Sequence, residues 1–460
     1  MVNSGVCSLR TRCLRFPHLP ETPLFPPLRF SLTCRCRRAL VTASAVSETY
    51  KKKETREKVI VISGPTGAGK SRLALELAKR LNGEIVSADS VQVYQGLDVG
   101  SAKPSPNDRK EVKHHLIDIL HPSKDYSVGQ FFEDARQATR CILDNGRVPI
   151  VVGGTGLYLR WFIYGKPDVP KASAYVKSKV YSELAELQKN EDWDAAVQLV
   201  VDAGDAKAQT LAVNDWYRLR RSLEIIKSSG SPPSAFRVPY DSFRELGDSS
   251  DTNGFESSDV KISGNSVEDS KFSDLPYEFI CFFLSSQRLD LYKTIDQRCE
   301  DMLLGRDGIL SEARWLLKLG LHPNSNSATR AIGYRQAMEY LLRCQRHGGQ
   351  SSAEEFYNFL SEFQKETRNF AKRQLTWFRN DHIYHWLDAS KPLDAIIEFI
   401  DNAYHDWSGK LVVPEHLRMS KDISNRQEAA QLKSYRTKNR HFMKDEDCSR
   451  ILEWIRKTEE

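Results

Sequence analysis

The chain has 460 residues, of which 40% are hydrophobic and 28% charged, a composition typical of a soluble folded protein. No apolar run is long enough to span a bilayer, so we expect no membrane partner. The net charge of +6 suggests nucleic-acid binding, but residues 1–47 hold seven arginines and one acid, which leaves the remainder nearly neutral. Any nucleic-acid interface must therefore be a local patch.

The first 50 residues are rich in Arg, Ser and Pro and poor in acids, and they lack the hydrophobic stretch of a secretory signal. This composition predicts a transit peptide for the plastid or the mitochondrion. The alternative is a basic tail without a targeting role. Nine cysteines are scattered singly, apart from Cys34 and Cys36 in the leader, so neither a structural zinc site nor a disulfide framework is predicted.

A β-branched run at 59–62 predicts a buried strand, and leucines at helical spacing over 73–81 predict a helix. The pattern G-x-x-x-x-G-K-S between them is typical of a P-loop, whose backbone N–H groups converge on a phosphate. The alternative is a chance glycine-rich turn. We expect a di- or triphosphate to bind Gly64, Pro65, Thr66, Gly67, Ala68, Gly69, Lys70 and Ser71, with Ser71 also a ligand of Mg²⁺.

Further strands are predicted at 84–88, 115–119 and 148–152, with a helix at 131–143. Strands that alternate with helices indicate an α/β fold, a P-loop NTPase-like doubly wound parallel sheet, over residues 58–166. The carboxyl ends of parallel strands meet at one edge of the sheet. The P-loop, Asp89 and Thr155 are therefore expected in one crevice.

The remaining chain divides by composition. Residues 167–212 are polar and helical in pattern, which predicts an inserted helical lobe, and 213–240 hold an arginine-rich helix that we assign to the core. Residues 241–275 are acidic and poor in large apolar side chains, so a disordered loop is predicted. We expect a final strand and a C-terminal helical, RNA-binding region over 276–400, then a charged tail over 401–460.

One predicted helix, over 363–379, interleaves cations with aromatic residues. Lys365, Arg368, Lys372 and Arg379 share one stripe at helical spacing. Such a stripe favours contact with an RNA backbone, and the alternative is a solvated helix face.

Asp89 is the candidate catalytic group, because a carboxylate beside a bound diphosphate could take a proton from an incoming nucleophile. The alternative is an aspartate that only caps the next turn. No apolar strand ends in an aspartate of the kind that supports Mg²⁺ in ATPases and kinases, although a nucleotide kinase or NTPase stays open.

Nine ordered blocks, spread over residues 58–390, resemble the tRNA dimethylallyltransferases, and the leader suggests a plant organellar type. The blocks are 64–71, 89–94, 100–104, 114–118, 126–128, 153–158, 218–224, 331–335 and 372–379. The resemblance implies transfer of a dimethylallyl group from dimethylallyl diphosphate to N6 of adenosine 37 in tRNA, with release of diphosphate. The product would feed tRNA-derived, cis-zeatin-type cytokinin.

The resemblance also implies roles for residues. Asp89 would be the general base, Thr155 would fix the line of attack and Arg218 would lie near the diphosphate. The anticodon stem-loop of tRNA and the donor would be the partners, Mg²⁺ the cofactor, and a monomer is expected. The tRNA-binding residues would be Ser90, Val91, Gln92, Arg221, Gly333, Tyr334, Arg335, Lys372, Arg373, Gln374, Trp377 and Arg379.

The sequence departs from the family pattern at Ser101, where threonine is usual, and at Tyr217, where glutamine is common. His441 and Cys448 alone cannot form the C-terminal zinc finger of some eukaryotic relatives. Three alternatives stay open: an adenylate isopentenyltransferase, a P-loop nucleotide kinase or NTPase, and a catalytically silent RNA-binding relative.

Overall fold

The structure is a computed structural model that describes residues 56–241, 275–304, 308–408, 411–421 and 426–459. The predicted leader, and all but the two ends of the predicted acidic loop, lie outside these residues. Contacts divide the chain into residues 1–51 and 52–460, and all the described residues belong to the second unit.

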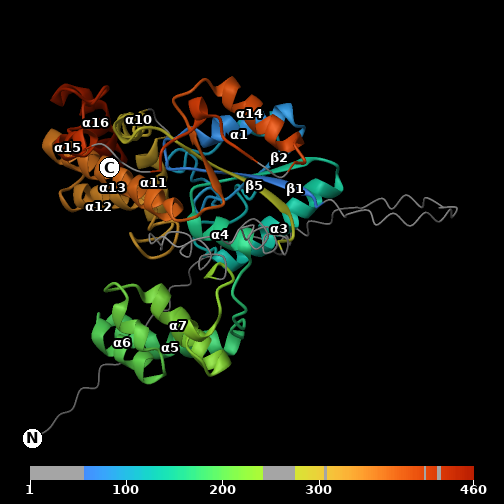
Figure 1. Cartoon of the computed structure of the whole chain (residues 1–460). Coiled ribbons are helices and arrows are strands. Elements are labelled where there is room, and N and C mark those ends of the chain that lie inside the picture. Colours follow the sequence, from blue (N-terminus) through green and yellow to red (C-terminus); the bar gives the residue numbers. More distant parts are fainter. Residues whose placement is uncertain (1–55, 242–274, 305–307, 409–410, 422–425, 460) are drawn as a thin grey trace, which may run out of the picture. The chain divides into compact units, whose positions relative to one another are not determined.

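The described strands form a six-stranded sheet in the order β3-β2-β4-β1-β5-β6 (Figure 1). Every neighbouring pair is parallel, and the register places Ile62 opposite Val152 and Phe282. The strands are β1 (Lys58–Ser63), β2 (Gly83–Ser87), β3 (His114–His115), β4 (Val148–Val152), β5 (Glu278–Ser285) and β6 (Tyr384–Asp388). The predicted α/β fold is confirmed.

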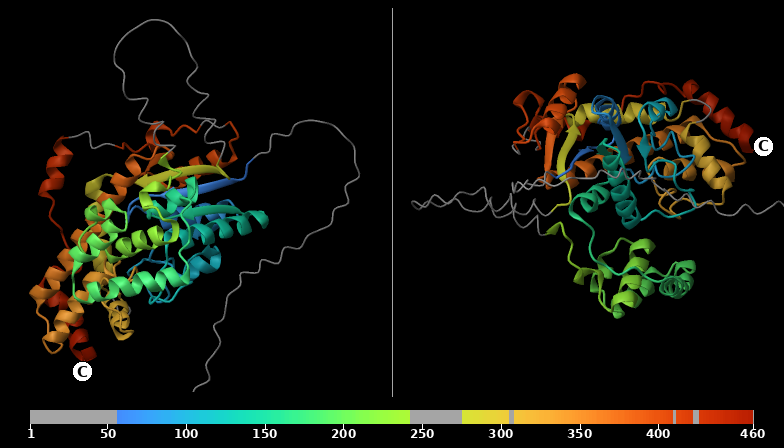
Figure 2. Two further views of the ribbon diagram at one scale, coloured as in Figure 1. Left: turned by 90° about the horizontal axis from the view of Figure 1, so that it is seen from below. Right: turned by 90° about the vertical axis from the view of Figure 1, so that its right-hand side faces the viewer.

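Successive side chains of β1 point to opposite faces of the sheet, and both sets are apolar. Helices therefore cover both faces (Figure 2). Ile60 and Ile62 pack with α1 (Lys70–Arg80) and α14 (Leu393–His405). Val59 and Val61 belong to a second apolar cluster, with α3 (Val128–Asp144) and α4 (Gly156–Tyr164). A short helix, α2 (Pro106–Glu111), begins at a capping box formed by Ser105.

Two predictions about strands need correction. Residues 276–400 contain a second strand, β6, at the sheet edge next to β5, whereas the sequence pattern predicted only helices after the first. Tyr384, Trp386 and Leu387 are buried there, although charged and polar neighbours hide the apolar pattern. The strand predicted at 115–119 is also shorter, because Leu116 and Asp118 have positive φ and end it.

The inserted lobe consists of α5 (Ala174–Lys189), α6 (Trp193–Asp202) and α7 (Trp216–Ser229). These helices share an apolar cluster of their own, with Trp193 and Trp216 edge to face at 5.1 Å between ring centroids. The assignment of 213–240 to the core is therefore corrected, since α7 buries Leu219 and Leu223 against the lobe instead.

The helical region after β5 contains α10 (Arg288–Asp301), α11 (Ile309–Lys318), α12 (Tyr334–Arg346) and the 27-residue α13 (Ala353–Arg379). The chain then returns through α15 (Arg426–Ser434) and α16 (Ser449–Glu459). Phe442, Cys448 and Ile455 are buried in the same apolar cluster as α12 and α13, so the charged tail is part of the folded unit. None of the described helices is long and apolar enough to cross a membrane.

Candidate active site

Three loops leave the sheet at its carboxyl edge from the neighbouring strands β2, β4 and β1. Asp89 follows β2, Thr155 follows β4 and the P-loop follows β1. The loops approach closely: the Ala88 N–H donates to the Val152 carbonyl at 2.7 Å, and the Gly153 N–H to the Ile62 carbonyl at 3.2 Å. The predicted convergence of these signals is thus present in the structure.

The P-loop needs glycine at its first position. Gly64 packs so closely on β5 that an added Cβ would lie 2.2 Å from the Leu284 carbonyl oxygen. Gly69, at φ +86, ends the loop, and Lys70 then begins α1. The Lys70 ammonium donates to the Pro65 carbonyl at 2.8 Å, which closes the loop around its backbone N–H groups. The Ser71 side chain is exposed in the first turn of α1.

Helix α10 lies directly over the P-loop. A Cβ at Gly67 would lie 3.2 Å from Ile295 and 3.6 Å from Leu291. Arg298 is on the same face of α10, because residues three, four and seven apart share one face of a helix. Burial is the main cause that lowers the pKa of Lys70, to about 7, and the Arg298 guanidinium adds to it, while Asp89 opposes them.

Arg298 is the residue that sequence reasoning missed. Burial lowers its pKa, and the nearby Asp89 carboxylate opposes that shift. Among the described residues, no carboxylate forms an ion pair with Arg298. Lys70 and Arg298 thus form a paired cationic site beside one carboxylate, which suits a strongly negative ligand.

Asp89 forms a turn of its own. Its Oδ1 accepts from the N–H groups of Val91 at 2.8 Å and Gln92 at 3.3 Å. This fits the turn-capping interpretation, yet it also fixes the carboxylate and leaves Oδ2 without a hydrogen bond from any described residue. The Gln92 amide is used internally, since Oε1 accepts from Ser87 and Nε2 donates to the Ser101 carbonyl.

Thr155 is the N-cap residue of α4, but its hydroxyl makes no side-chain cap hydrogen bond. The alternative that this hydroxyl only caps the helix is therefore wrong, and the group is available at the site. Position 153, two residues before Thr155, needs glycine, because a Cβ there would lie 2.1 Å from the Ala88 carbonyl oxygen. The end of β4 therefore packs closely against Ala88, the residue before Asp89.

Gln374, predicted as a tRNA contact, is instead buried between two catalytic loops. Its Oε1 accepts from the Thr66 N–H at 2.9 Å, and its Nε2 donates to the Gly154 carbonyl at 3.0 Å. The side chain is 6% exposed, so it joins α13 to the P-loop and to the end of β4.

We expect Gln374→Met to lower the free energy of unfolding by about 2 kcal/mol or more, because a buried N–H and a buried carbonyl lose their partners. Denaturant titration would measure the loss. Lys365→Met, at an exposed position of the same helix, is the matched control and should change little. Equal effects of the two variants would show that the bridge is unimportant.

Tyr334 is also placed differently from the prediction that it contacts tRNA. The ring is fully buried, and the hydroxyl donates to Glu312 at 2.6 Å. The Glu312 carboxylate accepts three more bonds, from the N–H groups of Asp98 and Val99 at 2.7 Å and of Gly100 at 3.0 Å. The motif at 331–335 therefore anchors the loop that follows the Asp89 turn.

Arg218 lies in the first turn of α7, on the lobe, with its side chain 69% exposed and its Nε 3.4 Å from Asp215. Arg221 pairs with Glu224 at 3.1 Å on the same helix. No interaction joins Arg218 to the P-loop among the residues described. Arg298 instead lies on the face of α10 that packs over the P-loop, whereas Arg218 lies on the lobe.

The cations in the C-terminal half of α13 divide into two groups. Arg368 is turned inward and paired with Asp296, and the Arg379 Nε donates to the Lys421 carbonyl at 3.1 Å. Lys372 and Arg373 remain exposed, as does Trp377. The exposed part of the predicted tRNA surface is therefore smaller than the sequence pattern indicated.

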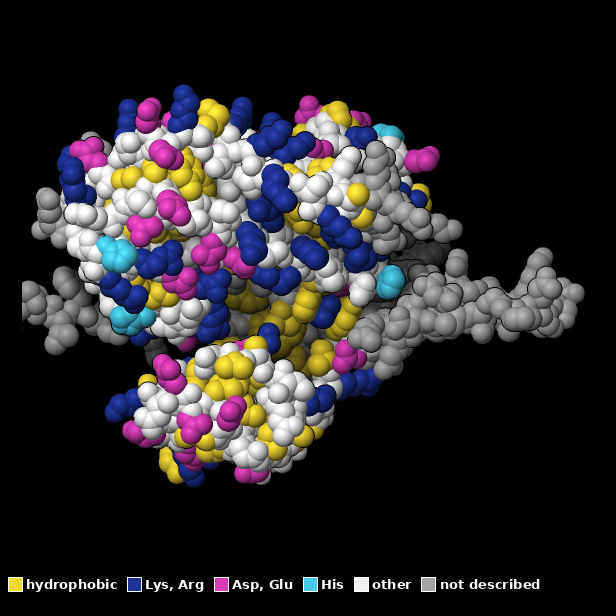
Figure 3. All heavy atoms as spheres, turned by 90° about the vertical axis from the view of Figure 1, so that its left-hand side faces the viewer, with side chains coloured by type: hydrophobic (Ala, Val, Ile, Leu, Met, Phe, Trp, Pro, Cys, Tyr) yellow, Lys and Arg dark blue, Asp and Glu magenta, His cyan; other side chains and the backbone are white. Residues whose placement is uncertain are grey.

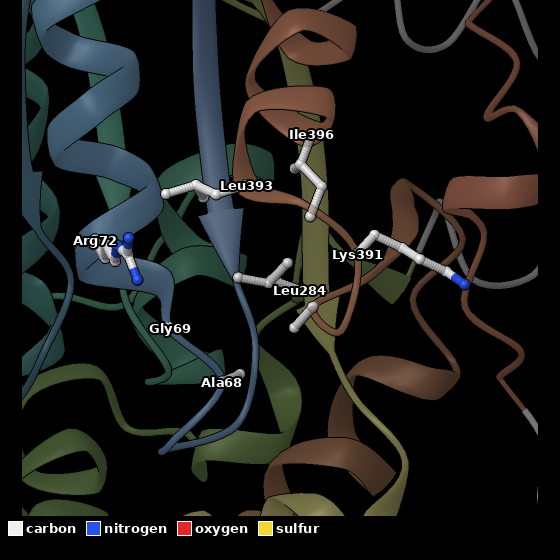
Figure 4. A pocket seen from close by; sticks show the side chains of 8 residues that line it. Ala68, Gly69, Arg72, Leu284, Lys391, Leu393 and Ile396 are labelled. Atoms are coloured by element: carbon white, nitrogen blue, oxygen red, sulfur yellow. The ribbon is translucent and has the colours of Figure 1, made fainter.

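A pocket of about 300 Å³ lies on the other side of the P-loop from Asp89 and Thr155, beside β5 and the loop after β6. Figure 4 shows Leu284 between Ala68 and the two α14 side chains Leu393 and Ile396, while Lys391 extends away from them. Five apolar residues line this pocket together with Gly69, Arg72 and Lys391, and its lining includes no carboxylate.

The fold and the crevice define a class of protein, a P-loop protein in which the Asp89 carboxylate lies on the loop neighbouring the P-loop. A family model described as IPP transferase matches residues 92–381, and one described as isopentenyl transferase matches 57–123. The chain belongs to the IPP transferase family, the tRNA dimethylallyltransferases.

Three relatives support this assignment. The chain is 62% identical to tRNA dimethylallyltransferase 9 of Arabidopsis thaliana, over 99% of this chain and 96% of the relative. It is 36% identical to the tRNA dimethylallyltransferase of Protochlamydia amoebophila, over 73% and 85% of the two chains. A solved structure of a eukaryotic dimethylallyltransferase acting on tRNA is 25% identical, with a TM-score of 0.53, over 75% of this chain and 80% of that one.

Proposed function

We propose that the protein transfers the dimethylallyl group of dimethylallyl diphosphate to N6 of adenosine 37 in tRNA, beside the anticodon. The observation that carries this proposal is the convergence of the P-loop, the Asp89 turn and α10: Lys70 begins α1, α10 packs over Gly67, and the Asp89 turn lies on the neighbouring loop. A diphosphate fits the cations and the P-loop amides, and an amine that must lose a proton fits the carboxylate.

The P-loop, Lys70 and Arg298 stabilise the charge that develops on the departing diphosphate. As the C1–O bond of the donor breaks, its electron pair leaves with the diphosphate. The lone pair of the adenine N6 forms the new bond to C1, and Asp89 takes the N6 proton. The half-buried Thr155 hydroxyl holds the donor or the base in line. The adenine must leave its stack to reach this crevice.

Mg²⁺ is proposed as the cofactor. No group of three or more His, Cys, Asp or Glu that could hold a metal occurs among the described residues, so the protein would supply few ligands. This fits Mg²⁺, which keeps several waters and binds through substrate phosphates, with the exposed Ser71 hydroxyl as the protein ligand. When bound, the ion would neutralise diphosphate charge.

We expect kcat/KM for the donor to fall as the pH rises from about 6 to about 9, because Lys70, whose pKa is about 7, loses its proton and its attraction for the diphosphate. Initial rates at saturating tRNA would measure the profile. Lys70→Arg should flatten it, since a guanidinium stays protonated. A wild-type profile that does not fall in this range would contradict the prediction.

The tRNA would bind over the exposed part of α13, at Lys372, Arg373 and Trp377. Figure 3 shows the side of the molecule at the left of Figure 1, where lysine and arginine side chains gather beside a hollow lined by hydrophobic side chains. Such cations follow the phosphate backbone, and an exposed tryptophan can stack on an unpaired base.

Lys372→Ala is expected to weaken tRNA binding and to reduce the slope of log K against log salt by about one unit, because one phosphate contact is lost. Binding assays over a series of salt concentrations would measure it. Lys79→Ala is the control, because Lys79 lies at the far end of α1 and pairs with Glu76 and Glu111. An unchanged slope for Lys372→Ala would identify the stripe as a solvated face.

Labelled dimethylallyl diphosphate, offered to the enzyme with tRNA or with AMP, tests the proposed acceptor. We expect label in tRNA and none in AMP. Label in AMP alone would identify an adenylate isopentenyltransferase. ATP hydrolysis without prenyl transfer would identify a nucleotide kinase or NTPase.

We propose that the leader, residues 1–50, directs import into the plastid or the mitochondrion. A reporter fused to these residues should enter one of these organelles, and a diffuse cytosolic signal would contradict the proposal. We also propose that the enzyme acts as a monomer, and that turnover of the modified tRNA yields cis-zeatin-type cytokinin.

A further inference from the structure

Helix α10 has two functional faces. Leu291, Ile295 and Arg298 lie on the face that meets the P-loop and Lys70. Asp296 and Glu300 are four residues apart and therefore share a face, which is opposite that of Arg298. Both carboxylates are buried, at 2% and 1% exposed.

The partners of these carboxylates come largely from one segment near the C-terminus, residues 435–442, which we term the strap. Asp296 Oδ2 accepts from the hydroxyls of Tyr435 and Thr437, both at 2.9 Å. Glu300 accepts from the backbone N–H groups of Arg440, His441 and Phe442 at 2.7–3.1 Å.

The strap is also tied to α13. Asp296 Oδ1 accepts from Arg368, whose Nη1 donates to Thr437 at 3.0 Å as well. Gln364 Nε2 donates to the Asp296 carbonyl at 3.3 Å and to Asn439 Oδ1 at 3.1 Å. Helix α10 also contacts α15, the helix that directly precedes the strap (Figure 1). Helix α10 is thus held by several bonds to charged groups, which are stronger than neutral ones.

We propose that the strap is a positioning element of the donor site, which holds α10 so that Arg298 faces the diphosphate on the P-loop. It lies outside residues 92–381, which the IPP transferase model matches. The inference rests on the proposed role of Arg298 in donor binding. The proposal is based on the hydrogen bonds from the strap to α10, the helix that carries Arg298. These bonds are made on the face of α10 opposite Arg298, by Asp296 and Glu300.

The test uses the full-length chain with Tyr435→Phe and Thr437→Val combined, which removes both hydroxyls and preserves side-chain size and charge. We expect the KM for dimethylallyl diphosphate to rise by roughly 10-fold, because a small displacement of a binding group is costly. The KM for tRNA should be unchanged. Ser434→Ala is the control, because the Ser434 hydroxyl bonds only within α15.

Two further variants keep the result decisive. Glu300→Gln, which places an amide NH₂ against the strap N–H groups, should also raise the donor KM and spare the KM for tRNA. In an Arg298→Ala background the Tyr435/Thr437 substitutions should add no further increase. If Arg298→Ala raises the donor KM and the strap variants lower only the melting temperature, or raise the tRNA KM instead, the strap inference is overturned. If Arg298→Ala itself leaves the donor KM unchanged, the proposed role of Arg298 fails first.

Discussion

Asp89→Ala is expected to lower kcat for prenyl transfer by about 10²-fold or more, because it removes the carboxylate proposed to take the N6 proton. The KM for dimethylallyl diphosphate should change little, since the P-loop and Lys70 remain. Single-turnover rates with saturating donor and tRNA would measure the loss.

Asp89→Asn is the matched control for the shape of the turn. The asparagine Oδ1 can still accept from the N–H groups of Val91 and Gln92, as the aspartate does. A loss as large as that of Asp89→Ala would therefore assign the effect to the missing base. Near-normal turnover of Asp89→Asn would mean that the carboxylate serves only the turn.

Arg298→Ala is expected to lower kcat/KM for the donor by about 10²- to 10³-fold, the size of effect seen when one donor to a developing negative charge is removed. Part of the loss should appear in kcat, because the charge on the diphosphate grows as the C1–O bond breaks. Steady-state kinetics with varied donor would separate the two parts.

Lys293→Ala is the control on the same helix, since Lys293 is an exposed cation that pairs with Asp290 at 3.0 Å. It should leave both constants near those of the natural protein. Unchanged donor kinetics for Arg298→Ala would exclude this guanidinium from the site and would favour Arg218 as the arginine near the diphosphate.

The sheet and the crevice could be predicted from sequence because their signals are local. The P-loop pattern follows directly on a β-branched run, and Asp89 and Thr155 each follow a strand. Parallel strands then bring the three loops to one edge, whatever the lengths of the connections. Strand order and the position of each residue at a strand end are therefore enough to predict the crevice.

Arg298 could not be predicted in this way. It lies in the middle of α10 without any motif, and its role depends on α10 packing over Gly67, a contact between distant parts of the chain. The same limit explains Gln374 and Tyr334. Each is polar and has a cation next to it in the sequence, yet tertiary packing buries it against specific partners, Thr66 and Glu312.

Local sequence patterns also could not predict the edge strand β6 or the strap. The alternation of His385 and Asp388 with apolar residues in β6 is too short to separate from a helix. The strap is polar and charged, and it is ordered because two buried carboxylates of α10 accept its hydrogen bonds. Nothing in the sequence pairs those carboxylates with that segment.

A structure of the enzyme with tRNA and an unreactive thio analogue of the donor tests the central claim most directly. We expect the diphosphate on the P-loop in contact with Lys70 and Arg298, and an extruded adenine whose N6 lies about 3 Å from Asp89. A nucleoside triphosphate held on the P-loop with its terminal phosphate aimed at the acceptor, and no base beside Asp89, would contradict it.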